Sequence, residues 1–67
     1  MKAKILKTIE ILKTEYNSGG YTSFEYNDLL IALNHTVFNM VKFLLVDDIN
    51  AGEIQELIHK EQDLITF

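Results

Sequence analysis

The sequence predicts an all-α protein, a single domain of three helices that takes up residues 1–67. Apolar residues recur with the 3.6-residue period of a helix in three successive segments, and two of these segments start with a capping-box pattern. The chain also has no proline, and its three glycines occur at only two places. We therefore expect helices near residues 3–17, 23–47 and 53–66, of which the central one is long and broadly apolar.

The first expected helix, residues 3–17, carries one apolar stripe. At about 100° per residue, its members fall on one face; they are Ile5, Leu6, Ile9, Leu12 and Tyr16. Polar residues, including several lysines, fall on the opposite face. The helix should end at the sequence "NSGG", because Gly19 or Gly20 can adopt the left-handed conformation that closes a helix.

The second helix should begin after Thr22, in the sequence "TSFE". The Thr22 side chain can accept a backbone N–H of the first turn while the Glu25 side chain bonds back to Thr22. More than half of the helix circumference is then apolar: Leu29, Leu30, Ile31, Leu33, Val37, Phe38, Met40, Val41, Leu44 and Leu45. An ordinary surface helix has an apolar arc of little more than about 100°. This helix must therefore be covered on two sides.

Two parts of this segment leave alternatives open. Asn34 lies within the apolar arc, where a buried Asn can pair with its symmetry mate and set the register of two helices. Alternatively, the helix breaks at residues 34–36 and Asn34 lies in a turn. Residues 41–46, "VKFLLV", are rich in β-branched and aromatic side chains, so a strand is the main alternative to helix there.

The third helix should begin within "DDINAGE", with Asn50 as its cap and Glu53 as the reciprocal residue of a second capping box. Its apolar face consists of Ile54, Leu57, Ile58, Leu64 and Ile65. Glu61 projects from the same face. Either Glu61 has a buried Lys or His partner, or the helix frays at its end, and we expect fraying.

The excess of apolar surface on the second helix predicts a homodimer. Each flanking helix is about 15 residues, or about 22 Å, long, so the two cannot cover an unbroken central helix over its whole length. A second copy is the simplest cover for a domain with so small a core. We expect the dimer interface to consist of Leu30, Asn34, Val37, Val41 and Leu44.

Composition and the distribution of apolar residues argue against an oxidising compartment, a membrane span and a signal peptide. The chain has no cysteine, so it has no disulfide and no thiolate metal site, and nothing points to an oxidising compartment. Asn34, His35, Asn39 and Lys42 interrupt the apolar run of residues 29–46, which argues against a membrane span. The N-terminal segment lacks the continuous apolar stretch of a signal peptide. We expect a cytoplasmic protein that does not contact a membrane.

The sequence offers no set of residues for catalysis or metal binding. His35 and His59 lie on different expected helices, and neither has a second ligand at the spacing that zinc sites use. The segment 47–53 does not place oxygen ligands and glycine in the frame of a calcium-binding loop. Ser18 and Ser23 occupy turn and cap positions without an adjacent base. We expect no enzymatic activity, no metal and no cofactor.

The remaining features favour a protein partner. A small helical body with a net charge of −4 can present a rigid acidic surface to a basic target and gain association rate by electrostatic steering. We expect a non-enzymatic regulatory or inhibitory protein that acts as a homodimer through protein–protein binding. The residues expected to contact this partner are the acidic Asp47, Asp48, Glu53 and Glu56 and the aromatic Tyr21 and Tyr26.

Direct DNA binding is the alternative function. Residues 21–45 have a weak helix-turn-helix pattern, with residues 36–45 as the recognition helix. Four of the six basic residues are Lys2, Lys4, Lys7 and Lys13. This basic end either contacts phosphates or faces the acidic third helix. The net negative charge, the short turn and the single cation of the recognition helix, Lys42, make nucleic acid the less favoured partner.

Overall fold

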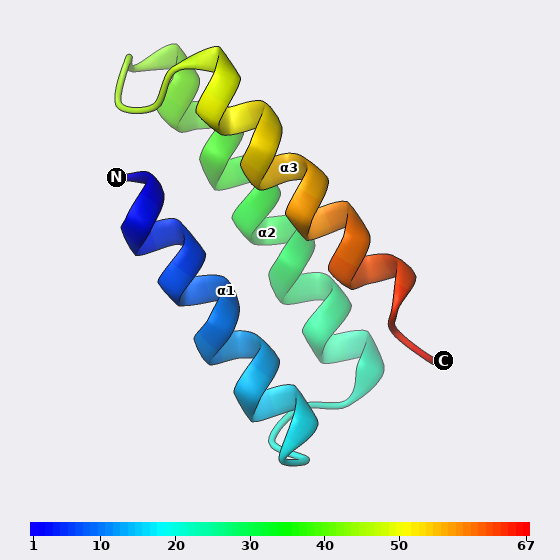
Figure 1. Cartoon of the computed structure of the whole chain (residues 1–67). Coiled ribbons are helices and arrows are strands. Elements are labelled where there is room, and N and C mark those ends of the chain that lie inside the picture. Colours follow the sequence, from blue (N-terminus) through cyan, green and yellow to red (C-terminus); the bar gives the residue numbers. More distant parts are fainter.

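The computed structural model describes the whole chain, residues 1–67, as three helices: α1 (Lys2–Asn17), α2 (Ser23–Lys42) and α3 (Asp48–Asp63). α2 runs antiparallel to α1, α3 returns alongside α2, and each helix contacts the other two (Figure 1). The bundle is elongated, with principal extents of 35 × 18 × 15 Å. The all-α, three-helix prediction is confirmed, and no residue lies in a strand.

The core lies where the apolar stripes of the three helices meet. Ten buried residues form it: Ile5, Ile9, Tyr26, Leu30, Val37, Val46, Ala51, Ile54, Ile58 and Ile65. Full burial of a large apolar side chain contributes about 1.5–3 kcal/mol, so a core of this size stabilises the fold only modestly. None of the three helices has the length and apolar character that a membrane crossing requires.

The start and middle of α2 agree with the sequence. The Glu25 backbone N–H donates to Thr22 Oγ1 at 3.1 Å, and the Thr22 N–H donates to Glu25 Oε1 at 2.9 Å, which confirms the first capping box. α2 continues without a break through residues 34–36. The alternative of a break at Asn34 is therefore wrong, and α2 lacks the turn that a helix-turn-helix needs at this position.

The junction between α2 and α3 differs from the prediction. α2 ends at Lys42 rather than at residue 47, and α3 begins at Asp48 rather than at residue 53. Asp47, not Asn50, caps α3: its carboxylate accepts the Asn50 backbone N–H at 2.7 Å and the Asn50 side-chain amide at 3.0 Å. Asp is as good a cap as Asn, and an acidic first turn suits the helix dipole, so the earlier start is physically favourable.

α1 ends as the glycines predict, in a Schellman motif. The Gly20 N–H donates to the Glu15 carbonyl at 2.7 Å, and the Gly19 N–H donates to the Tyr16 carbonyl at 3.1 Å. Gly19 has a φ of 88°, in the left-handed region where glycine has no steric penalty.

α2 ends in the same motif without a glycine. The Leu45 N–H donates to the Met40 carbonyl at 2.9 Å, and the Leu44 N–H donates to the Val41 carbonyl at 3.1 Å. Leu44 occupies the left-handed position, with a φ of 59°. For an L-residue with a Cβ this conformation costs about 1–2 kcal/mol. Because leucine is not a local signal for a helix end, the helix predicted from the apolar pattern runs beyond the actual end of α2 at Lys42.

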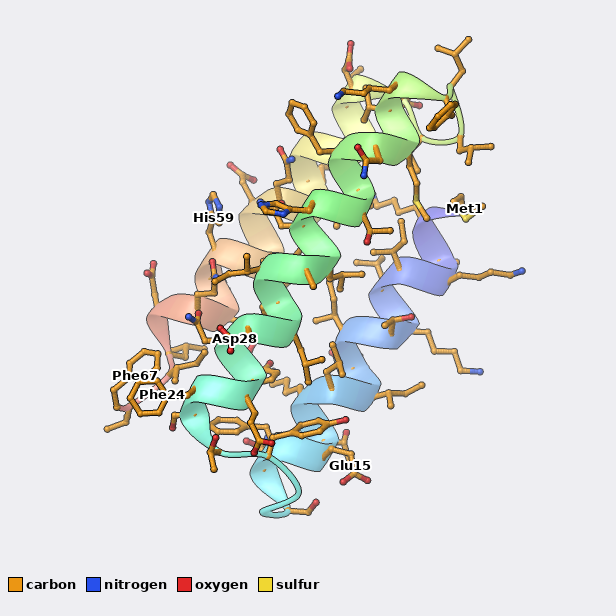
Figure 2. All side chains as sticks on the ribbon, turned by 180° about the vertical axis from the view of Figure 1, so that it is seen from behind. Met1, Glu15, Phe24, Asp28, His59 and Phe67 are labelled. Carbon is orange, nitrogen blue, oxygen red and sulfur yellow. The ribbon has the colours of Figure 1, made fainter.

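The C-terminal segment is held against the start of α2. The Ser23 hydroxyl donates to the Thr66 carbonyl at 2.7 Å and lies 3.0 Å from the Tyr16 hydroxyl. The Phe67 ring lies beside Phe24, with ring centroids 5.2 Å apart (Figure 2). These contacts close the end of the bundle opposite the α2–α3 turn.

Replacing Leu44 by glycine should raise the free energy of unfolding by about 1 kcal/mol, because glycine removes the left-handed penalty. Urea denaturation measures this change. Leu45→Gly should give no gain, since Leu45 does not have a positive φ. Gly19→Ala should lose about 1 kcal/mol in the equivalent position of α1. A Leu44→Gly variant that is less stable than the natural protein would contradict the left-handed assignment.

Candidate functional site

The turn between α2 and α3 presents a group of apolar side chains to solvent. We call Phe43, Leu44 and Leu45 of this turn, together with Ile49 in the first turn of α3, the tip; they are 76, 91, 54 and 77% exposed. The turn forms one end of the bundle and extends past the start of α1 (Figure 1). Single exposed apolar residues are ordinary, but a contiguous exposed group marks a candidate contact surface.

The local backbone explains why these side chains point outward. The left-handed residue Leu44 reverses the chain just after α2. Two residues later Val46, only 6% exposed, enters the core, and Asp47 then caps α3. With Val46 filling the space below the turn, the neighbouring tip side chains remain in solvent.

Carboxylates follow the tip along the first half of α3. We call Asp47, Asp48, Glu53 and Glu56 the acidic band; all four are exposed. Asp47 uses its carboxylate as the cap of α3, and Glu53 forms an ion pair with Lys2 of α1. Asp48 and Glu56 take part in neither of the two ion pairs of the chain. The tip and the acidic band thus form one apolar and acidic surface.

The two tyrosines expected on this surface lie elsewhere. Tyr21 lies in the α1–α2 turn and Tyr26 in α2 just after it, at the end of the bundle opposite the tip (Figure 1). Tyr26 is only 1% exposed and stacks on Tyr16, with ring centroids 4.4 Å apart and planes at 11°. Tyr21 is half-buried against the core. Tyr26 is therefore a core residue, and its prediction as a contact residue is wrong.

The residues expected at a dimer interface do not share an open surface. Leu30 and Val37 are fully buried in the core, and Val41 packs against it. Asn34 is half-buried, and its side-chain oxygen is buried without a hydrogen-bond partner. Only Leu44 is exposed. α1 and α3 already cover this face of α2, so the interface predicted there is wrong, while the homodimer itself stays a prediction.

A polar cluster lies near the α1–α2 end of the bundle. Glu61 remains helical and is only 7% exposed, and its Oε1 lies 3.2 Å from the Lys13 Nζ. The expected fraying is wrong, because a lysine partner compensates the buried carboxylate. A cavity of about 100 Å³ beside this pair is lined by Lys13, Tyr16, Asn17, Tyr26, Glu61, Leu64 and Ile65. It contains no serine, cysteine or histidine to act as a nucleophile or general base.

The Tyr26 hydroxyl is buried in this cluster without a hydrogen-bond partner. Burial raises the pKa of Tyr26 above its usual value of about 10, and the carboxylates of Glu61 and Glu10 raise it further. The two histidines lie apart from the cluster, and no three acidic or histidine side chains gather as metal ligands. The cluster therefore joins α1 to α3 through the Lys13–Glu61 pair and α1 to α2 through the stacking of Tyr16 on Tyr26.

Comparisons with protein-family models, with curated proteins and with solved structures find no significant match to this chain.

Removing Lys13 should leave Glu61 buried and unpaired, so Lys13→Met should cost about 1–3 kcal/mol of unfolding free energy. The double variant Lys13→Met/Glu61→Met should be closer to the natural protein than Lys13→Met, since an apolar pair leaves no charge buried. Lys2→Met removes an exposed pair and should cost less than about 1 kcal/mol. A loss for the double variant equal to the sum of the losses of Lys13→Met and Glu61→Met in urea denaturation would show that Lys13 and Glu61 act independently.

Tyr26→Phe should be neutral or stabilising at neutral pH, because it removes a buried hydroxyl without a partner. Tyr16→Phe is the matched control and should lose about 0.5–1.5 kcal/mol with its hydrogen bond to Ser23. Because the pKa of Tyr26 is raised in the folded protein, its contribution to stability is fully present below the unfolded-state pKa of about 10. This contribution is lost as the pH rises towards the higher folded-state pKa. Tyr26→Phe should lose less stability in this alkaline range. A large loss for Tyr26→Phe at neutral pH would contradict the unpartnered hydroxyl.

Proposed function

We propose that this chain is a non-enzymatic regulatory protein that binds another protein through the tip. The observation that carries the proposal is Leu44, which is 91% exposed and held in a left-handed backbone conformation. The residue combines an unfavourable backbone with an unfavourable exposure of apolar surface. Strain of this kind is typical of functional sites, where another requirement keeps the residue in place.

The tip has the properties of an apolar anchor. Three of its side chains come from one short turn and the fourth, Ile49, from the first turn of α3; two Schellman hydrogen bonds and the Asp47 cap fix this backbone. A fixed backbone loses little conformational entropy on binding. Each large apolar side chain contributes about 1.5–3 kcal/mol when a partner buries it completely. A cleft that accepts two or three of these side chains would bind the turn with useful affinity.

The acidic band defines the chemistry of the partner. Asp48 and Glu56 remain available beside the tip, and the whole chain has a net charge of −4. The surface therefore suits an apolar cleft bordered by lysine or arginine, with long-range attraction increasing the association rate. When the cleft belongs to a protein that uses its basic border for nucleic acid, occupation by this chain inhibits that protein.

The ion pairs weaken the case for DNA binding. Lys2 pairs with Glu53, and Lys13 pairs with Glu61, so α3 engages two of the four N-terminal lysines. Lys4 and Lys7 remain exposed on α1. Two lysines on an acidic protein provide few of the phosphate contacts on which nonspecific DNA affinity depends.

Leu44→Asn provides a sharp test of the tip. Asparagine tolerates the left-handed conformation and leaves the charge unchanged, so the variant should fold while it loses the apolar anchor. Immobilised natural protein should capture a specific partner from a cell lysate, and Leu44→Asn should lose it. Ile11→Asn is the matched control, since Ile11 is an exposed apolar residue of α1, and this variant should keep the partner.

A parallel titration with mixed-sequence duplex DNA at low salt separates the two functions. The proposal predicts no binding beyond that of an unrelated acidic protein. Salt-sensitive duplex binding that is lost when Lys4 and Lys7 are replaced, together with no captured partner, would overturn it. Capture that is equal for the natural protein and Leu44→Asn would exclude the tip as the contact surface.

A further inference from the structure

The solvent-facing side of α2 carries exposed residues at a regular spacing. Six exposed residues lie along it, separated alternately by four and three positions: Phe24, Asp28, Ile31, His35, Phe38 and Lys42. We call them the outer stripe. Figure 2 shows Phe24 at the start of α2 and Asp28 on the side facing the viewer. At about 100° per residue, all six lie within about 40° of one line, on the side away from the buried Leu30 and Val37.

The spacing of the outer stripe is that of a coiled-coil seam. Apolar residues recur every seven positions as Phe24, Ile31 and Phe38, which are 70, 40 and 58% exposed. Polar residues recur every seven positions between them. From residue 24 to residue 42 the stripe is about 27 Å long at 1.5 Å per residue. Neither α1 nor α3 covers it, although it has the length and periodicity of a helix-pairing surface.

We propose that the outer stripe pairs with the outer stripe of a second copy in antiparallel orientation. Asp28 and Lys42 lie seven residues before and seven residues after His35. A two-fold axis near His35 therefore brings Asp28 of each copy towards Lys42 of the other. Parallel pairing would instead place Asp28 opposite Asp28 and Lys42 opposite Lys42. The charge pattern thus complements itself, which identifies a second copy as the partner.

A groove beside the outer stripe can accommodate Phe24 of the other copy. It lies between α2 and α3, has a volume of about 260 Å³, and is lined by Phe38, Val41, Lys42, Asp48, Ala51, Gly52 and Gln55. A Cβ added at Gly52 would have no atom within 4 Å, so the space above this residue is open. Antiparallel pairing brings Phe24 of the other copy to this end of α2. A cavity of about 150 Å³ already holds benzene, so the groove has room for this ring.

This surface differs from the one predicted on the opposite face of α2; it includes no tip residue and shares only Asp48, which lines the groove, with the acidic band. Antiparallel pairing places the two tips at opposite ends of the dimer, where both remain free to bind. The contact is a single pair of helices with three apolar residues on each side, so we expect weak, reversible association.

Sedimentation equilibrium over a dilution series tests the association. The average mass should rise from that of one chain towards that of two as the concentration rises. Ile31→Asp and Phe38→Asp should each weaken association by roughly a hundredfold, because every dimer loses the residue twice. Both variants should keep their helical circular dichroism, since these side chains are exposed in the monomer. Ile11→Asp, an exposed position of α1, should associate normally. A natural protein that is monomeric at all concentrations would overturn the proposal.

Charge reversal tests the pairing of Asp28 with Lys42. Asp28→Lys should weaken association by about tenfold, since it places two pairs of lysines together. The double variant Asp28→Lys/Lys42→Asp should restore it. Association that is lost in Phe38→Asp but is unchanged in Asp28→Lys would contradict the antiparallel arrangement. Leu44→Asn should not change self-association, so failure of the tip and failure of the outer stripe are distinguishable.

Disulfide cross-linking tests the orientation directly, because the natural chain has no cysteine. His35→Cys places one thiol of each copy near the two-fold axis and should form cross-linked dimers in a thiol–disulfide buffer. Asp28→Cys places the two thiols far apart and should remain uncross-linked. Efficient cross-linking of Asp28→Cys would establish parallel pairing and exclude the arrangement proposed here.

Discussion

The reversal of the chain between Lys42 and Asp48 is the constraint on which the rest of the structure depends. Val46 must enter the core and Asp47 must cap α3, and both require the backbone to turn sharply just after α2. The left-handed Leu44 makes this turn and carries its energetic penalty. With the reversal at this point, α3 starts early enough to run alongside α2 and to bury Ala51, Ile54 and Ile58.

The apolar residues of α2 and of the turn that follows it are distributed over three surfaces. One face, with Leu30 and Val37, is covered by α1 and α3 and forms the core. The residues that follow the helix become the exposed tip. The outer stripe keeps its apolar residues on the side facing solvent. A broadly apolar helix can thus pack one face into the core of the monomer and leave another face exposed for binding, because different faces make different contacts.

Charged side chains of α1 and α3 form ion pairs between the two helices. Lysines at both ends of α1 lie against the acidic α3, where Lys2 pairs with Glu53 and Lys13 pairs with Glu61. The exposed pair contributes little to stability, whereas the pair with the buried Glu61 makes the packing of α1 on α3 specific. Of the carboxylates outside these two pairs, Asp47, Asp48 and Glu56 belong to the acidic band, and the others lie on α1, on α2 and at the end of α3. The proposed contact surface therefore carries unpaired negative charge beside its apolar side chains.

The local pattern of the sequence determined the all-α class, the Thr22 capping box, the glycine end of α1 and the apolar stripes, because these features depend on neighbours within one or two turns. It also indicated that the basic N-terminal end can face the acidic third helix. Only the tertiary structure decided where α2 ends, because leucine is not a local signal for a left-handed turn, and only packing makes the turn favourable. Periodicity placed Glu61 on the apolar face of the third helix. However, its pairing with Lys13, the burial of Tyr26 and the exposure of the tip depend on how the three helices pack against one another, which the pattern within one helix does not specify.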